Sequence, residues 1–139
     1  MIYAIIESYL GPNGRAMLHF YQTNSLAINS VVVLYGLLIV LSWTNLVSIR
    51  KRLIGSIVAQ MVQSGTLHSR SKVKRVLSEV DIPWQAAIDD VRFPFVARQT
   101  AFWPKRKTVE AVQELLPAED LAQQALEALA AREAAAEAA

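Results

Sequence analysis

The chain has 139 residues and a formal net charge of only +2, but its charges are divided among an uncharged stretch, a basic middle and an acidic tail. It has no cysteine, which excludes disulfides, thiolate zinc sites, iron–sulfur clusters and covalently attached c-type haem. There is no nucleophile elbow, P-loop, dinucleotide fingerprint or HExxH motif, so the sequence predicts neither an enzyme nor a cofactor or metal site.

The longest apolar stretch covers residues 26–49, which carry no charge. As a helix rising about 1.5 Å per residue, this stretch is roughly 36 Å long and exceeds the roughly 30 Å hydrocarbon thickness of a bilayer. We therefore predict one transmembrane helix over residues 25–49. Residues 1–24 are predicted to form an N-terminal segment outside the cytoplasm or in the membrane interface, with a turn at residues 11–14 (GPNG).

Basic residues follow the span at once, and residues 50–78 contain no acid, so the positive-inside rule places the C-terminus in the cytoplasm. These bases are predicted to lie on the membrane surface, where anionic lipid head groups are nearer partners than nucleic acid. They are Arg50, Lys51, Arg52, Lys72, Lys74 and Arg75.

A few polar residues interrupt the span, most of them near its two ends. Those at the inner end, including Thr44 and Asn45, are interpreted as solvated at the interface or bonded to the backbone. Asn29 and Gly36 recur on one face of the helix, and we predict that this face contacts a partner helix. The glycine would permit close approach, and the asparagine would bond across the contact.

The predicted elements after the span are short. Residues 50–82 are expected to form basic amphipathic helices, the first of which either continues the span or bends onto the membrane surface and ends at Gly65. Residues 83–107 begin with a short helix after Pro83 and continue as an irregular arm rich in aromatic and basic side chains. Thr108 is expected to cap the next helix, and residues 108–139 form an acidic, alanine-rich helical tail.

The predicted fold is mainly α. It has a single-pass transmembrane helix, short flanking amphipathic helices and the irregular arm, with no independent globular core. Each short piece has one apolar face without an evident complement, so the chain is expected to lie along a larger protein. The aromatic side chains after the basic region are the expected anchors in that interface. They are Trp84, Phe93, Phe95, Phe102 and Trp103.

These features favour a non-catalytic accessory or structural subunit of a larger integral-membrane complex, which the cytoplasmic arm would clamp. In general architecture the chain is similar to the small one-span subunits of respiratory and photosynthetic complexes. This likeness is architectural only, and it makes a bioenergetic assembly one candidate. An alternative is a membrane-tethered adaptor that recruits soluble cytoplasmic proteins. A homo-oligomeric pore is disfavoured, because the span is featureless and contains no ionisable residue.

Overall fold

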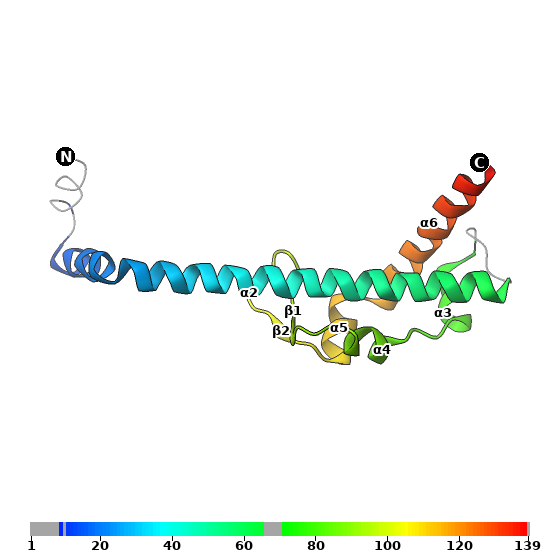
Figure 1. Ribbon diagram of the computed structural model, residues 1–139, viewed down its shortest axis with the longest axis horizontal. Helices are drawn as coiled ribbons and strands as arrows, with labels where there is room; N and C mark the ends of the chain where they lie inside the picture. Colours follow the sequence, from blue (N-terminus) through cyan, green and yellow to red (C-terminus); the bar gives the residue numbers. More distant parts are fainter. Residues whose placement is uncertain (1–8, 10, 66–70, 139) are drawn as a thin grey trace. The chain divides into compact units, whose positions relative to one another are not determined.

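The computed structural model describes residues 9, 11–65 and 71–138. The predicted mainly helical fold is confirmed (Figure 1). The helices are α2 (Pro12–Ser64), α3 (Val73–Glu79), α4 (Trp84–Asp89), α5 (Val109–Leu115) and α6 (Ala118–Glu137), and the strands are β1 (Phe95–Val96) and β2 (Lys105–Arg106). The chain divides into two compact units, Met1–Leu38 and Ile39–Ala139, and the boundary between them falls inside α2.

Helix α2 is longer at both ends than the predicted span. It begins at Pro12, whose fixed φ suits the first turn of a helix, so the predicted turn at residues 11–14 is wrong. Inside α2 the backbone leaves helical angles only at Asn24, with φ −112° and ψ 15°. The backbone then keeps helical angles to Ser64, and the helix ends at Gly65, whose φ of 62° is left-handed. The predicted basic amphipathic helix after residue 49 therefore continues the helix of the apolar stretch.

In the part of the chain that the structure describes, α2 is the one helix long and apolar enough to cross a membrane. Its large apolar side chains in the N-terminal unit are exposed, and Leu26, Val31 and Leu34 are each at least 65% accessible. This stretch is therefore compatible with a transmembrane helix, because lipid would cover the surface that the chain itself leaves open. The predicted segment over residues 1–8 lies outside the described residues.

The C-terminal unit has a hydrophobic core, so the expected lack of an independent core is not confirmed. One wall of the core is a stripe along α2, in which Ile49, Leu53, Ile57 and Met61 are all 0% exposed. Their spacing of four residues puts them on one face of the helix. The short elements that follow supply the opposite wall, with Val76, Ile88, Val96, Val112, Leu121, Ala125 and Leu129. The short apolar faces thus find their complement within the chain, in one cluster shared by α2 and the short elements.

The short elements also pack on one another along the C-terminal half of α2 (Figure 1). Helix α3 contacts α6, and α4 contacts α5. Several local predictions hold: α4 begins directly after Pro83, and the Thr108 side chain accepts a hydrogen bond of 3.2 Å from the backbone N–H of Ala111 at the start of α5. The last turns of α6 point away from the other elements, and every described residue after Leu129 is exposed.

Candidate functional site

The aromatic and basic arm is held against α2. It contains a short antiparallel hairpin with two residues in each strand, and the rest of residues 92–107 is irregular, as predicted. Phe95 pairs with Arg106, and Val96 pairs with Lys105. The anchor is Asn45, which is only 4% exposed and donates hydrogen bonds of 2.9 Å and 2.8 Å from Nδ2 to the carbonyl oxygens of Phe93 and Phe95. One residue beyond β1, the Ala97 N–H donates a 3.2 Å bond to the carbonyl oxygen of Ser42. Asn45 therefore fixes the base of the hairpin on α2.

Further bonds tie the base of the hairpin to its neighbours. The Lys107 backbone N–H donates to the carbonyl oxygen of Pro94 at 2.9 Å, and its Nζ donates to the carbonyl oxygen of Val91. On β2 itself, Lys105 Nζ lies 2.6 Å from both carboxylate oxygens of Glu114 on α5. Because bonds hold both strands, the loop between them is presented from a fixed base.

The structure separates the five predicted aromatic anchors into two groups. Trp84 packs against the core, and Phe93 and Phe95 are half-buried with their ring centroids 5.9 Å apart. In contrast, Phe102 and Trp103 are 77% and 74% exposed in the loop between β1 and β2. Their rings meet edge to face, with centroids 6.3 Å apart and an interplanar angle of 69°. We call this exposed pair the aromatic tip.

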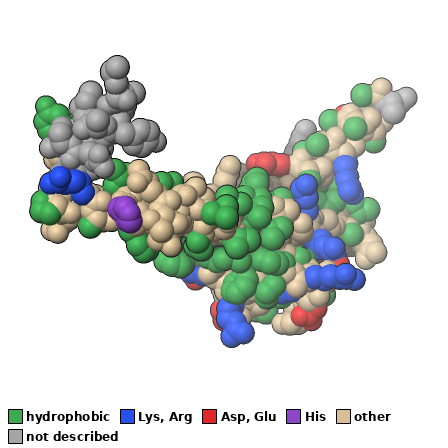
Figure 2. All heavy atoms as spheres, turned by 60° about the vertical axis from the view of Figure 1, so that its left-hand side comes forward, with side chains coloured by type: hydrophobic (Ala, Val, Ile, Leu, Met, Phe, Trp, Pro, Cys, Tyr) green, Lys and Arg blue, Asp and Glu red, His purple; other side chains and the backbone are tan. Residues whose placement is uncertain are grey.

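The predicted membrane-surface bases also differ in their surroundings. Arg52 forms an ion pair with Asp90, and Arg75 Nε lies 2.7 Å from Glu79 Oε1. The three lysines, Lys51, Lys72 and Lys74, are exposed. Figure 2 shows the Lys and Arg side chains of the C-terminal unit beside hydrophobic side chains. Arg52 and Arg75 are thus partly neutralised by the chain's own acids, whereas the lysines remain available to an anionic surface.

The predicted helix-contact face around Asn29 and Gly36 is exposed. Asn29 Oδ1 accepts a 3.3 Å hydrogen bond from the Tyr21 hydroxyl, and a Cβ placed on Gly36 would meet no atom within 4 Å. The hydroxyls of Ser30 and Thr44 bond to backbone carbonyls one turn earlier, as the interpretation of the polar residues expected. The contact of this face with a partner helix stays a prediction.

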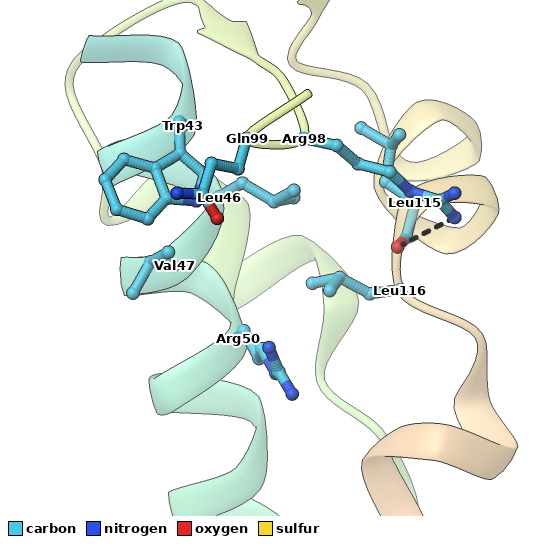
Figure 3. Close-up of a pocket in the computed structure, with 8 residues that line it drawn as sticks. All are labelled: Trp43, Leu46, Val47, Arg50, Arg98, Gln99, Leu115 and Leu116. Atoms are coloured by element: carbon cyan, nitrogen blue, oxygen red, sulfur yellow. Dashed lines mark hydrogen bonds between the residues drawn. The ribbon is translucent and has the colours of Figure 1, made fainter. Parts of the chain in front are cut away.

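Sequence reasoning missed a cavity of about 280 Å³ beside α2 (Figure 3). One wall comes from α2, and the others come from the loop after β1 and the end of α5. The lining residues are Trp43, Leu46, Val47, Arg50, Arg98, Gln99, Leu115 and Leu116. Arg98 Nη2 donates a long, 3.5 Å bond to the carbonyl oxygen of Leu115. No local pattern predicts this cavity, because its two arginines are far apart in sequence.

The Lys105–Glu114 pair predicts a pH dependence. The hydrogen bond from Lys105, and then the attraction of its charge, lower the pKa of Glu114 below its ordinary value of 4.5. A lowered carboxyl pKa contributes stability above the unfolded-state value, and this contribution is lost as the pH falls through the folded-state value. Glu114→Gln is therefore expected to lower the Tm slightly at neutral pH, since the pair is exposed. As the pH falls below 4.5 and then through the lowered pKa of Glu114, the Tm of the variant and of the unchanged protein should converge.

Thermal unfolding of the full chain across this pH range tests the prediction. Glu110→Gln is the matched control, because it removes another exposed acid from the same helix, and its Tm difference should not follow that pattern. A Tm difference for Glu114→Gln that stays constant down to the acid limit would contradict the role given to this ion pair.

Within the described residues, no cluster of His, Asp and Glu side chains could hold a metal ion. The candidate site consists of the aromatic tip and of the cavity lined by Arg50 and Arg98, both on the C-terminal unit. In comparisons with known proteins, no family model matches the chain, and neither a curated protein nor a solved structure matches it.

Proposed function

We propose that this protein is a non-catalytic accessory subunit of a larger integral-membrane complex. The apolar part of α2 anchors it in the bilayer, and the aromatic tip binds the partner on the cytoplasmic side. The expected lack of a core does not support this proposal, since the C-terminal elements pack on α2. The support comes instead from the exposed aromatic pair on a hairpin whose base is fixed.

The exposure of Phe102 and Trp103 is the observation that carries the proposal. Large aromatic side chains are enriched among the residues that contribute most to binding energy, and they lose little conformational entropy when they are already held in place. Two such rings in contact with each other form a compact apolar projection. Basic side chains on β2 flank this projection, and they suit a partner surface that combines an apolar pocket with acidic groups.

We place the hydrocarbon-spanning part of α2 toward the N-terminal side of residues 25–49. The backbone of residues 93–97 covers Ser42 and Asn45, so lipid does not surround the helix there. About 20 residues cross the hydrocarbon layer, and a span of that length ending near Trp43 begins near the kink at Asn24. Trp43 then lies at the cytoplasmic interface, where tryptophan is favoured.

Replacing both tip residues tests the proposal. The double substitution Phe102→Ala and Trp103→Ala is expected to release an integral-membrane partner that co-purifies stoichiometrically in mild detergent. The amount of partner retained should fall by roughly tenfold or more, while the variant protein itself stays in the membrane pellet after a carbonate wash. Quantitative mass spectrometry of the tagged full chain measures retention.

Val62→Ala is the matched control, because it removes another exposed apolar side chain from the same unit and should leave retention unchanged. Equal retention in the double variant would reject the aromatic tip as the contact. A partner that is soluble and is released by salt would instead support the adaptor function.

A further inference from the structure

The basic cavity beside Trp43 adjoins a second cavity of about 310 Å³, and together they form a groove along α2. The two cavities share Arg50, Arg98, Leu115 and Leu116. The first cavity is lined by two arginines and no acid, whereas the second also has Asp120 in its lining. An anion is therefore favoured in the first cavity and opposed beside Asp120 in the second.

The two arginines retain donors for a ligand. A guanidinium has five N–H groups. Arg50 donates from Nε to Gln124 Oε1 at 2.7 Å, which orients its side chain beside the cavity. Arg98 donates from Nη2 to the carbonyl oxygens of Glu114 and Leu115 at 3.5 Å, and bonds of that length are weak. A phosphate accepts several charge-assisted hydrogen bonds from such groups and would replace weak bonds with strong ones.

The part of the cavity wall that α2 supplies before Arg50 is apolar, and it belongs to the helix that we place in the membrane. Trp43, Leu46 and Val47 lie on α2 before Arg50. By the helical rise, Arg50 lies about 10 Å along the axis from Trp43. The head-group layer on each side of a bilayer is roughly 5–8 Å thick, and the long arginine side chain extends toward it. A ligand that combines a phosphate with an apolar part fits this arrangement.

We propose that the groove binds an anionic phospholipid of the cytoplasmic leaflet, with its phosphate between Arg50 and Arg98 and its apolar part along Trp43, Leu46 and Val47. The first cavity has no carboxylate to hold a choline or ethanolamine group, so a lipid with net negative charge is preferred. The inference rests on the membrane insertion in the proposed function. The inference adds a lipid-binding site in which Arg98, a residue distant in sequence from the span, is one of the two principal phosphate-binding residues.

Native mass spectrometry of the full chain in detergent, with added lipid, tests the site. Phosphatidylglycerol should be retained about tenfold or more above phosphatidylcholine. In the double variant Arg50→Gln and Arg98→Gln, its retention should fall to the phosphatidylcholine level. The matched control is Arg92→Gln with Arg132→Gln, which removes two exposed arginines outside the groove and should leave retention unchanged. Equal losses in both variants would overturn the site.

A second measurement keeps both arginines, in case the double variant fails to fold. Gln99 lines the first cavity, and a photo-crosslinking residue at this position should capture phosphatidylglycerol in preference to phosphatidylcholine in mixed vesicles. Equal crosslinking to both lipids would overturn the proposal. Glycerol 3-phosphate, added without lipid, should not compete at the concentration that saturates the lipid site. Competition at that concentration would assign the groove to a soluble phosphate instead.

A carbonate wash separates failure of this inference from failure of the proposed function. If the protein leaves the membrane pellet, the insertion itself is rejected. If the protein stays in the pellet and shows no preference for phosphatidylglycerol, only the groove is rejected. Loss of the co-purifying partner on substitution of the aromatic tip is independent of both results.

Discussion

Ile57→Ala is expected to lower the free energy of unfolding of the C-terminal unit by about 2–5 kcal/mol. The Ile57 side chain is 0% exposed in the middle of the α2 stripe. This stripe belongs to the same core cluster as the buried residues of the later elements. Truncation removes buried apolar surface and leaves a cavity that the surrounding helices fill only in part. Urea unfolding of the full chain in detergent micelles, followed by tryptophan fluorescence, measures the change.

Val62→Ala is the control for this prediction, because Val62 lies on the same helix but is 60% exposed. It is expected to change stability by no more than about 0.5 kcal/mol. If Ile57→Ala were equally neutral, the last turns of α2 would not be packed against α3 to α6. This part of the helix would then lie on the membrane surface, which is the alternative stated in the sequence analysis.

Asn45→Ala is expected to cost about 2–3 kcal/mol and to detach the hairpin from α2. The substitution removes both bonds that Nδ2 donates and leaves the carbonyl oxygens of Phe93 and Phe95 without those donors. Buried acceptors that lose a partner carry a desolvation penalty beyond the bond itself. Hydrogen exchange of the amides in residues 93–107 should accelerate more than exchange in α6, because the hairpin opens locally.

Two further variants make the Asn45 prediction specific. Asn45→Asp keeps the shape of the side chain but, when ionised, replaces the donor with an acceptor that repels both carbonyls, so it should be at least as destabilising as alanine. Thr44→Ala changes the preceding residue, which is exposed and whose hydroxyl donates only to the carbonyl oxygen of Val40, one turn back. Equal exchange rates in Asn45→Ala and Thr44→Ala would contradict the anchoring role.

The sequence predicted the elements whose signals are local. The uncharged stretch predicted a long apolar helix, Thr108 predicted the start of α5, and Gly65 predicted the end of α2. Each of these signals acts through the backbone within a few residues. The turn predicted at residues 11–14 failed because a proline beside glycines is also compatible with the first turn of a helix.

The core and the candidate site could not be predicted, because they depend on pairings between distant residues. Asn45 was one polar residue among several near the end of the span, and its partners lie 48 and 50 residues away. The amphipathic stripe after Arg50 was visible in the sequence, but periodicity does not say whether lipid, a partner or the chain itself covers such a stripe. The grouping of Arg50 with Arg98 depends on the same pairing.

The order of the core residues along the chain has a consequence for biosynthesis. The stripe on α2 ends at Met61, but the side chains that cover it continue to Leu129 in α6. A nascent chain therefore carries an open apolar helix face until α6 has left the ribosome, and such a face is prone to association with other chains.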